Sequence, residues 1–498
     1  MRLDLLVISD FHYVRRAESF SSNPERKTRH GIIFLKKALQ RLKYENIQPD
    51  AILINGDIVD EAGVEHADDD LRDFAAAAKK LELPILAVPG NHDGQPKQFG
   101  EIFNCPPGLH ILGQYGFFIF HDQPQKDETV TRSQIELAQL QEVHELHPEM
   151  PLIALQHNPV HPKIESFYPY NPANSAEIVD SYAKNKVILS LSSHYHHGQP
   201  AHKVGEVMYY TVPAICEAPY RFAHVRLEER SVKITEHRLQ LEVSGLTDVH
   251  CHTEYAYCGH SVEAKENLEL TRMLGLSRLC LTEHSFQLYF EKDFAWSYKW
   301  QRDPDSAWQM IERGGRRRML AYKVFIEQFR VQNVLAGLEV DLLADGDILL
   351  ADEDRNDWDL LVGSIHQIPG VERGQIRQAE AERLFMREVE RLAHHPIQVM
   401  AHPFRFLRRN DFEIPVELYR RVAKILAARG IAAEINFHIN TPDPHFFEIC
   451  LEENVKIALG TDSHKLEKVA ELTPHLRLLR QIGVREKDYE DVLFGISN

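Results

Sequence analysis

This sequence has few cysteines, no long apolar run and no excess of basic residues. These three features argue against a disulfide-stabilised protein, a membrane protein and a nucleic-acid-binding protein, respectively. Six cysteines are scattered over 498 residues without a CxxC pair, which favours reduced thiols in a cytoplasm over a disulfide framework. No apolar run is long enough to span a bilayer, and the first residues, charged at Arg2 and Asp4, show no signal-peptide pattern. We therefore expect a cytoplasmic chain with no membrane partner.

Positive charge is in deficit along the whole chain. Lys and Arg total 57 against 74 Asp and Glu, which gives a formal charge of −17. Residues 1–246 carry 25 basic and 33 acidic side chains, or −8, and the rest carry 32 and 41, or −9. An acidic chain repels nucleic acid phosphates unless a local basic face or a metal reverses the field, so nucleic acid is the less favoured partner.

Histidine, by contrast, is abundant. The 28 imidazoles stand in an otherwise ordinary globular composition, with 43% hydrophobic and 26% charged residues. Many histidines beside Asp and Glu at strand ends are typical of metal sites. The oligomeric state is left open by these patterns.

The first half alternates strand and helix patterns, which indicates a layered α/β fold. Helical stripes comprise Ile32, Leu35, Leu39 and Leu42, then Leu71, Phe74, Ala75 and Ala78. After residue 205 the helical patterns stop, and three runs predict closing antiparallel strands, Val207–Val212, Phe222–Leu227 and Val232–Arg238. The earlier predicted strands are Leu3–Ser9, Ala51–Asn55, Ile85–Val88, Phe117–Phe120, Leu152–Gln156 and Val187–Leu191.

The second half starts afresh after a short junction, Leu241–Leu246. Helical patterns separate most of its strand candidates, which favours a barrel-like β/α fold of seven units. These candidates lie near Thr247, Arg278, Val334, Leu360, Val399, Ala433 and Ile457. We therefore predict two domains, residues 1–242 and 246–498.

Five polar blocks follow predicted strands in the first half. Residues at i and i+2 of an extended segment point the same way, so paired ligands can reach one ion. Carboxylate, imidazole and amide donors suit Mn, Fe or Zn, and one carboxylate can bridge two ions about 3.5–4 Å apart. The blocks are Asp10-Phe11-His12, Gly56-Asp57-Ile58-Val59-Asp60, Gly90-Asn91-His92-Asp93, His157 and His194-Tyr195-His196.

These blocks resemble the calcineurin-like metallophosphoesterase family, whose pattern is DxH, GDxxD, GNHD, a lone His and GHxH. The resemblance covers roughly the first 240 residues and implies a four-layer α/β sandwich with two divalent ions, Mn, Fe or Zn. It implies that Asp57 bridges the two ions. One ion would be held by Asp10, His12, Asp57 and His196, and the other by Asp57, Asn91, His157 and His194.

The same resemblance assigns catalytic roles. His92 is similar to the family's histidine that contacts phosphate and protonates the leaving oxygen, and Asp93 could orient it. Ser193 replaces the usual glycine before the last histidine pair, and we expect it to alter a turn and leave ligation unchanged.

Six further blocks follow predicted strands in the second half, at the barrel end where β/α folds place chemistry. His250 and His252 share a strand face, and Cys251 points away, so we interpret Cys251 as packing. The blocks are Asp248-Val249-His250-Cys251-His252, Thr282-Glu283-His284, Gly337-Leu338-Glu339-Val340-Asp341, Gly363-Ser364-Ile365-His366, Ala401-His402-Pro403 and Gly460-Thr461-Asp462-Ser463-His464.

These blocks resemble the PHP (polymerase and histidinol phosphatase) family over nearly the whole second half, and most resemble its histidinol phosphatase branch. The resemblance implies a distorted (β/α)7 barrel with two to three ions, Mn, Zn or Fe, and Glu339 as the bridging ligand. The spacing from His252 to His260 is slightly longer than usual, and the alternative for His260 is a surface residue. The implied ligands are His250, His252, Glu339 and Asp462 for one ion, Glu339, His366 and His402 for a second, and His260, His284 and His464 for a third.

Three features of the second half can each be interpreted in two ways from the sequence. Arg405 either binds a phosphate oxygen with its planar fork or is a solvated helix residue. The cluster Arg316–Arg318 is either surface or a local nucleic-acid patch. Cys258 is either buried packing or a weak extra ligand.

Both halves therefore predict a bifunctional metal-dependent phosphoesterase acting on small phosphorylated metabolites or nucleotides. In a sequential version the first half opens a diester and the second removes the resulting monoester phosphate. The alternatives are a nucleic-acid-processing nuclease or phosphatase, histidinol phosphatase activity in the second half, and a non-enzymatic metal-binding role for one half.

Overall fold

The computed structural model describes residues 2–16, 23–61, 66–94, 96–125, 129–165, 168–330, 333–371 and 376–495. The chain forms two compact units, Met1–Gln240 and Leu241–Asn498. The first unit contains two main sheets, and the second contains one sheet of seven strands.

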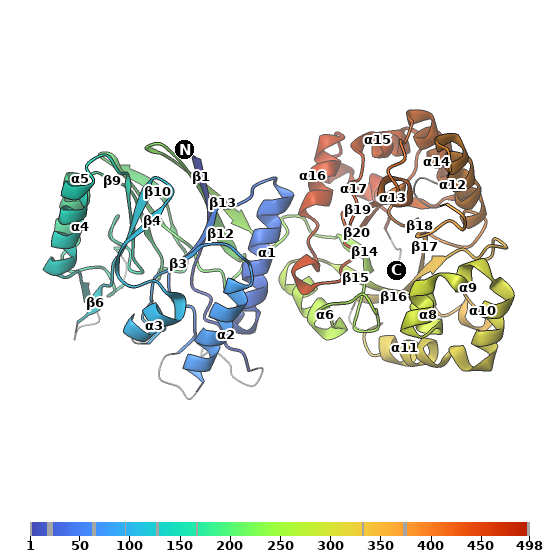
Figure 1. The fold of residues 1–498 in the computed structure, drawn as a ribbon, viewed down its shortest axis with the longest axis horizontal. Helices are drawn as coiled ribbons and strands as arrows, with labels where there is room; N and C mark the ends of the chain where they lie inside the picture. Colours follow the sequence, from blue (N-terminus) through green and yellow to red (C-terminus); the bar gives the residue numbers. More distant parts are fainter. Residues whose placement is uncertain are drawn as a thin grey trace. The chain divides into compact units, whose positions relative to one another are not determined.

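The first unit is a sandwich of two sheets covered by helices on both outer faces (Figure 1). One sheet has the order β13-β12-β1-β2-β3 and the other the order β10-β11-β9-β8-β5-β4. The strands are β1 (Arg2–Ile8), β2 (Ala51–Ile54), β3 (Ile85–Ala87), β4 (Gly108–Leu112), β5 (Tyr115–Ile119), β8 (Leu152–Leu155), β9 (Val187–Ser192), β10 (Gln199–Val204), β11 (Val207–Thr211), β12 (Arg221–Glu228) and β13 (Ser231–Arg238), with a small extra pair β6 (Gln123–Pro124) and β7 (Val130–Thr131).

Helices α1 to α3 pack on the first sheet and helices α4 and α5 on the second. In α2 the predicted stripe of Leu71, Phe74, Ala75 and Ala78 is fully buried, which is why this helix lies flat on its neighbours. The helices are α1 (Gly31–Tyr44), α2 (Ala67–Lys79), α3 (Pro96–Phe103), α4 (Gln134–Leu146) and α5 (Ser175–Lys184). This arrangement confirms the predicted four-layer α/β sandwich.

One detail of the predicted topology is wrong. The closing run of strands is antiparallel at β12 and β13, but β11 pairs in parallel with β9. Its antiparallel partner is β10, whose side chains are mostly exposed or half-buried and show no apolar run. The second sheet therefore extends beyond the strands that hydrophobicity predicts.

The second unit is a barrel of seven parallel strands. Neighbours follow chain order from β14 to β20, and the first and last strands meet through the bridge Cys251–Ser463. All seven predicted strands are present, which confirms the distorted (β/α)7 fold. They are β14 (Thr247–Cys251), β15 (Arg278–His284), β16 (Val334–Asp341), β17 (Leu360–Ser364), β18 (Val399–Met400), β19 (Ala432–Asn436) and β20 (Ile457–Gly460).

Side chains such as Val249, Cys280, Val362 and Ala458 fill the barrel core. The longest insertion lies between β15 and β16 and contains several short helices and one turn of π-helix, Ile311–Gly315. The helices are α6 (Ala264–Met273), α7 (Ser285–Tyr289), α8 (Lys292–Ser297), α9 (Lys299–Arg302), α10 (Pro304–Met310), α11 (Arg317–Glu327), α12 (Gln378–Leu392), α13 (Arg405–Arg409), α14 (Val416–Arg429), α15 (Pro444–Glu452), α16 (Thr473–Gln481) and α17 (Tyr489–Val492).

Within the described ranges, none of these helices combines the length and the apolar character that crossing a membrane would need.

Candidate metal centres

The predicted ligands of the first unit lie where strands end, but the backbone there is not extended. Asp10 and His12 follow β1 with φ of 53° and 45°, and Asp57 and His194 have φ of 49° and 65°. Such left-handed conformations cost about 1–3 kcal/mol each and gather at functional sites. The expected strand alternation is therefore wrong for Asp10 with His12 and for His194 with His196. Tight turns direct these side chains instead.

Asp57 lies at the centre of the first cluster. Its Oδ2 atom is 3.2 Å from His157 Nε2, 3.7 Å from His194 Nδ1 and 3.8 Å from His12 Nε2. The residue is 1% exposed. Although burial opposes ionisation, His157 and His194 hold the pKa of Asp57 well below its ordinary value. An ionised carboxylate between imidazoles is what a bridging ligand requires.

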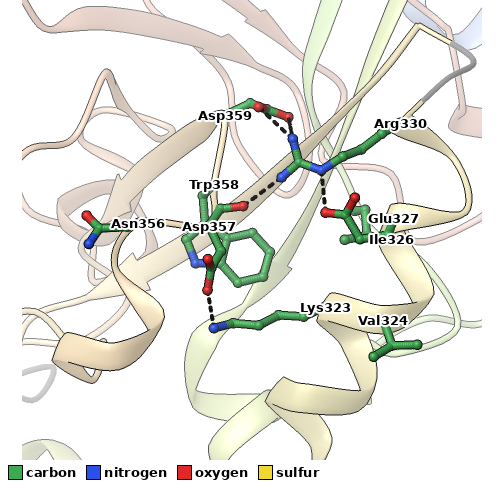
Figure 2. Close-up of a pocket in the computed structure, with 9 residues that line it drawn as sticks. All are labelled: Lys323, Val324, Ile326, Glu327, Arg330, Asn356, Asp357, Trp358 and Asp359. Atoms are coloured by element: carbon green, nitrogen blue, oxygen red, sulfur yellow. Dashed lines mark hydrogen bonds and ion pairs between the residues drawn. The ribbon is translucent and has the colours of Figure 1, made fainter.

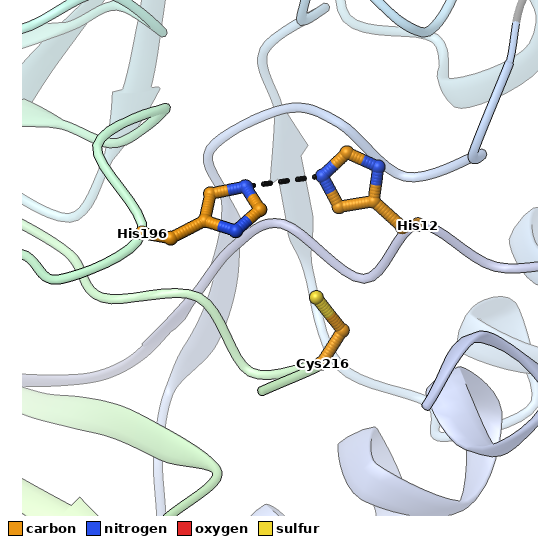
Figure 3. Close-up of side chains that lie close together, drawn as sticks. All are labelled: His12, His196 and Cys216. Carbon is orange, nitrogen blue, oxygen red and sulfur yellow. Dashed lines mark hydrogen bonds between the residues drawn. The ribbon is translucent and has the colours of Figure 1, made fainter. Parts of the chain in front are cut away.

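His12 and His196 form one flank of this cluster. Their Nε2 atoms face each other at 3.2 Å (Figure 3). On the far side of each ring, His196 Nδ1 is 2.6 Å from Glu217 Oε1 and His12 Nδ1 is 3.3 Å from Asp60 Oδ1. Those carboxylates can take the Nδ1–H groups, which turns both Nε2 lone pairs toward one point. The Sγ atom of Cys216 lies within 4.8 Å of both rings' ligand atoms.

His157 and His194 form the other flank. His157 Nε2 is 3.0 Å from His194 Nδ1, and His157 Nδ1 is 2.7 Å from Asn55 O. Ser193, which we expected only to alter a turn, also contacts His157 Nδ1 at 2.9 Å and donates to Asn55 O. A Cβ at Gly56, where φ is +91°, would lie 2.5 Å from His157 Nδ1. The turn after β2 therefore requires glycine, because its φ is positive and because a side chain would collide with His157.

The loop after β3 carries His92 and Asn91. The backbone N–H of His92 donates to Asp57 Oδ1 at 3.0 Å, and its Nδ1 contacts the carbonyl of Asp60. Asn91 is exposed. The structure therefore places His92 beside Asp57 and leaves the predicted ligand role of Asn91 as a prediction.

Asp93 does not orient His92, and that expectation is wrong. Its carboxylate accepts backbone N–H bonds from Ile58 at 2.7 Å, Val59 at 3.0 Å and Gly90 at 2.8 Å. Burial, with the nearby Asp57 charge, raises the pKa of Asp93 to about 6. Asp93 thus ties the two ligand-bearing loops together.

In the second unit, Glu339 of β16 occupies the equivalent central place. Its Oε1 is 3.0 Å from His402 Nε2 and 3.3 Å from His366 Nε2. Its Oε2 is 2.6 Å from His284 Nδ1 and 3.3 Å from His250 Nε2. Burial opposes ionisation, but His284 and His366 hold the pKa of Glu339 well below its usual range.

Asp462 and His252 adjoin this cluster. His252 Nε2 is 3.1 Å from Asp462 Oδ1, and His250 Nε2 is 3.9 Å from the same oxygen. His250 lies within β14 and His252 just after it, so strand alternation does direct both rings inward, as predicted. Asp462 and His402 both have left-handed φ, 49° and 30°.

Glu434 of β19 is a functional residue that the motifs did not indicate. Its Oε1 is 2.9 Å from His250 Nδ1, and its Oε2 accepts the backbone N–H of His402 at 2.6 Å. It is 0% exposed, and a Cβ at Gly460 would overlap its carboxylate. The available signal was one acidic residue in a buried strand whose other residues, apart from Asn436, are apolar.

Two more buried carboxylates lie beside predicted ligands. Asp341 Oδ1 is 2.9 Å from His366 Nδ1, and Glu283 Oε2 is 3.5 Å from His252 Nδ1. Asp341 can hold the Nδ1–H of His366 and leave its Nε2 for an ion, whereas Glu283 lies beside His252 without a hydrogen bond of acceptable geometry. Both residues stand in quoted motif blocks, but the sequence did not show which imidazole each one contacts.

Arg405 is not the solvated helix residue of one interpretation. It is 6% exposed, donates to Asp462 Oδ2 at 2.8 Å, and places Nη2 2.6 Å from His402 Nε2. Burial and the Arg405 charge lower the pKa of His402 well below its usual value, so this imidazole is neutral and able to bind an ion. The guanidinium therefore lies among the predicted ligands.

His260 departs from the expected third ligand group. Its side chain is exposed, while its backbone N–H donates to His464 O at 2.9 Å. Cys258, two residues earlier, places Sγ 3.0 Å from His464 Nε2. His284 and His464 do share a group of ligand atoms, together with His252. The geometry thus does not support the predicted ligand role of His260.

Unsatisfied buried atoms test whether divalent ions fit these clusters. Within the described part of the chain, the buried atoms that form no hydrogen bond of acceptable geometry include Asp10 Oδ1, His250 Nε2, His284 Nδ1 and Glu339 Oε2. Buried polar atoms without partners are costly, and divalent cations are natural partners for carboxylate and imidazole groups. The residues present therefore fit metal ions in both units.

A cavity of about 310 Å³ opens beside the second cluster. His366, Asp462 and His464 reach it from the metal side, and Arg405 and Arg409 supply positive charge. Its remaining wall is largely aromatic, from Phe286, Trp296 and Tyr298. A second cavity, of about 450 Å³, lies beside His196 and Glu217 of the first unit.

A cavity of about 480 Å³ at the amino ends of β16 and β17 carries no such chemistry (Figure 2). Its charged groups pair with one another, since Arg330 binds Asp359 at 2.8 Å and Glu327 at 2.6 Å, and Lys323 binds Asp357. We therefore assign this cavity a structural role.

The arginine cluster is also structural. Arg316 NH2 lies 2.6 Å from Asp354 Oδ1, and Arg318 donates to Tyr255 O at 2.6 Å and covers the Tyr257 ring at 4.4 Å. Arginines held in this way are not available as a nucleic-acid patch, which removes that interpretation for these two side chains.

Two family models match the chain. The calcineurin-like phosphoesterase model matches residues 3–198, and the PHP domain model matches residues 248–438. These matches confirm both resemblances.

Individual relatives match smaller parts. The chain is 34% identical over 79 residues to the 3',5'-cyclic adenosine monophosphate phosphodiesterase CpdA of Haemophilus influenzae. That match covers 15% of this chain and 27% of the relative, so the chain spans about a quarter of that protein's length.

Solved structures align with about half of the chain. A dimetal phosphatase from Danio rerio is 14% identical with a TM-score of 0.39, covering 47% of this chain and 98% of its own. A purple acid phosphatase from yellow lupin is 13% identical with a TM-score of 0.35, covering 48% of this chain and 52% of its own.

Proposed function

The chain belongs to two families, the calcineurin-like phosphoesterases over residues 3–198 and the PHP domains over residues 248–438, and we propose that it is a bifunctional enzyme with two working sites. Its two domains make it a metal-dependent phosphoester hydrolase. In our proposal residues 1–242 cleave phosphodiesters and residues 246–498 cleave phosphomonoesters.

One observation carries the proposal. Each unit buries a central carboxylate with a lowered pKa, Asp57 or Glu339, among imidazole nitrogens that lie 2.6–3.8 Å away. A carboxylate with ligands on two sides suits two ions, and phosphoester hydrolysis by paired ions uses that arrangement. A domain retained only as a scaffold would be expected to lose some metal-ligand residues, and no residue of either family's ligand pattern is missing from this sequence.

The residues of the first unit have separable tasks. Asp10, His12, Asp57 and His196 would hold one ion, and Asp57, Asn91, His157 and His194 the other, as Mn, Fe or Zn. Such ions supply Lewis-acid activation of the phosphoryl group and of water. His92 keeps its Nδ1 on the Asp60 carbonyl, so its Nε2 can donate a proton to the leaving oxygen.

The second unit supplies a more enclosed site. His250, His252, Glu339 and Asp462 would hold one ion and Glu339, His366 and His402 another, as Mn, Zn or Fe. Arg405 lines the cavity and can turn one N–H toward a phosphate oxygen while Asp462 keeps the other. We propose Arg405 as the residue that binds the phosphoryl group.

The substrates we propose are small. A cavity of about 310 Å³ suits a metabolite or nucleotide rather than a polymer, and the chain has an acidic balance of −17. The diester specificity that we propose for the first unit is supported by the partial likeness of the chain to a cyclic nucleotide phosphodiesterase. All six cysteines are free, which supports the cytoplasmic location that we propose.

Turnover by the metal-loaded full chain tests the activity. We expect hydrolysis of a chromogenic diester and of a chromogenic monoester with Mn²⁺, Zn²⁺ or Fe²⁺, and loss of both with a chelator. Failure to turn over either substrate with any of these ions would overturn the proposal. Cleavage of single-stranded DNA with a steep salt dependence would favour nucleic acid instead.

We further propose that the two sites act in sequence on one substrate. The test follows a cyclic nucleotide through both steps in a Glu339→Gln variant of the full chain. We expect the monoester product to accumulate and inorganic phosphate release to stop. Continued phosphate release by this variant would contradict the sequence of steps.

Histidinol phosphate is a second candidate for the PHP domain alone. The aromatic wall of Phe286, Trp296 and Tyr298 favours a phosphomonoester that carries a planar ring. Growth of a histidinol-phosphatase-deficient auxotroph on the wild-type gene, and not on the Glu339→Gln gene, would support it. No growth with an expressed wild-type chain would remove it.

A further inference from the structure

We propose that the PHP unit binds a third ion through the thiolate of Cys258 together with His284 and His464, and that His260 is not a ligand. This inference rests on the proposed function, because it adds an ion beside the pair around Glu339. The observation that carries it is the contact of 3.0 Å between Cys258 Sγ and His464 Nε2, with His260 exposed at the surface.

The orientation of His464 makes its Nε2 a ligand atom. Its Nδ1 is 2.9 Å from the carbonyl of Asp462, which can only accept a hydrogen bond. The proton therefore sits on Nδ1, and the Nε2 lone pair points at Cys258. At 3.0 Å the lone pairs of His464 Nε2 and Cys258 Sγ would repel each other. Either the thiol proton or a cation must therefore lie between the two atoms.

Independent observations point to an ion at this place. The ligand nitrogens of His252, His284 and His464 lie within 4.8 Å of one another. His284 is 5% exposed, and its Nδ1 atom forms no hydrogen bond of acceptable geometry among the described residues, although Glu339 Oε2 lies 2.6 Å away. Cys258 thus adjoins a group of metal-capable atoms and is not an isolated thiol.

The loop that carries Cys258 is fixed in this orientation. The buried Gln287 accepts the Tyr257 backbone N–H at 2.5 Å and places its own Nε2 3.4 Å from Cys258 Sγ. On the other side of Cys258, the N–H of Gly259 donates to Ala256 O at 3.0 Å. These bonds turn Cys258 inward, and Gln287 can donate to the thiolate.

A thiolate ligand changes which ion is favoured. Sulfur donors select Zn²⁺ or iron over Mn²⁺ and Mg²⁺, whereas the oxygen and nitrogen donors around Asp57 discriminate less. Binding would replace the S–H bond by a metal–sulfur bond and release one proton to solvent. We therefore expect the third ion to differ in kind from the ions of the first unit.

Cobalt substitution in the full chain tests the ligand directly. A Co²⁺–thiolate bond gives a near-ultraviolet charge-transfer band that nitrogen and oxygen ligands do not produce. We expect the band in the wild type and its loss in Cys258→Ser. The matched control is Cys216→Ser, because Cys216 also lies within 4.8 Å of two ligand imidazoles in the first unit. The control should keep the band.

Persistence of the band in Cys258→Ser, or its loss in Cys216→Ser alone, would overturn the proposal. Metal analysis provides the second measurement. Cys258→His should keep the bound metal of the wild type without the charge-transfer band, and Cys258→Ala should lose about one ion per chain. If His260→Ala loses that ion and Cys258→Ala does not, His260 is the ligand and our assignment is wrong.

These outcomes are separate from failure of the proposed function. If Glu339→Gln binds as much metal as the wild type and neither protein turns over phosphoesters, the proposed function fails whatever the sulfur band shows. If turnover and Glu339-dependent metal binding persist without any sulfur band, only the third-ion assignment fails.

Discussion

Asp57 and Glu339 show how single buried carboxylates organise the two sites. Both are almost inaccessible, yet both have a lowered pKa because imidazoles surround them. A buried charge is tolerated only with close partners, and here the partners are the imidazoles that we propose as metal ligands. In each unit the carboxylate, once ionised, is available on both of its oxygens to ions.

Glu434 gives a prediction at this scale. Glu434→Gln keeps the shape but weakens the hold on His250 Nδ1 and on the His402 backbone, so metal affinity of the PHP unit should fall about 10–100-fold. Competition with a fluorescent chelator measures it. Glu452→Gln, on the exposed face of α15, is the control, and equal affinities in both variants would contradict this role.

Asp354 gives a second prediction, about stability and pH. It is 0% exposed and bonds Arg316, Lys323 and Tyr289. Burial opposes ionisation, but these partners lower the pKa of Asp354. Its contribution is thus present above the unfolded pKa of about 3.9 and is lost as pH falls through the folded value.

We expect Asp354→Asn to lower the free energy of unfolding by about 2–3 kcal/mol at pH 7 and by much less near pH 3. Urea denaturation followed by tryptophan fluorescence measures this, because all four tryptophans, Trp296, Trp300, Trp308 and Trp358, lie in the second unit. A loss that is the same at both pH values would disprove the assigned ionisation.

Loops at strand ends, rather than the strands, decide the geometry at the scale of elements. In β14 the alternation of an extended strand correctly predicts that His250 and His252 share a face. After β1 and β9 the same argument fails, since Asp10, His12 and His194 adopt left-handed φ. Such turns depend on contacts between distant loops, which a local pattern does not contain.

The sequence also failed to predict part of the sheet edges, because edge strands can lack a clear apolar pattern. The seven barrel strands and the buried strands of the sandwich are apolar enough to predict from sequence. β10 is an edge strand whose side chains are half-buried or exposed, so no apolar run marks it. The sequence likewise does not reveal that Glu217 contacts His196 or that Glu434 contacts His250, because neither pair is adjacent in the chain.

The turn at Gly56 gives a prediction at this scale. Gly56→Ala adds a Cβ that presses on His157 Nδ1, so metal affinity of the first unit should fall about tenfold or more. Gly205→Ala is the matched control, because Gly205 also has positive φ but open space around a Cβ. Isothermal titration with Mn²⁺ compares them, and identical affinities would refute the steric argument.

The aromatic segment between β15 and β16 gives a second prediction at the scale of elements. Trp296 is 40% exposed and lines the cavity beside the metal ligands. Trp296→Ala should raise KM for a ring-bearing phosphomonoester about tenfold with little change in kcat, because uniform binding is lost. Trp308→Ala, on α10 away from the cavity lining, should leave KM unchanged. A fall in kcat alone would contradict the role of Trp296 as a binding wall.

At the scale of the whole molecule, two unrelated folds reach the same chemistry. A two-sheet sandwich and a seven-stranded barrel each place a carboxylate and several imidazoles at strand ends. Each unit has its own core and its own ligands, so inactivation of one should leave the other folded and loaded. The central claim is that the chain contains two independent phosphoesterase sites with different ester preferences.

The most direct test measures turnover of one diester and one monoester by metal-loaded wild type, Asp57→Asn and Glu339→Gln. We predict that Asp57→Asn abolishes diester cleavage only and Glu339→Gln abolishes monoester cleavage only, each by about 10³-fold or more. If either variant abolished both activities while the other retained both, one unit would account for all the catalysis and the claim of two sites would be contradicted.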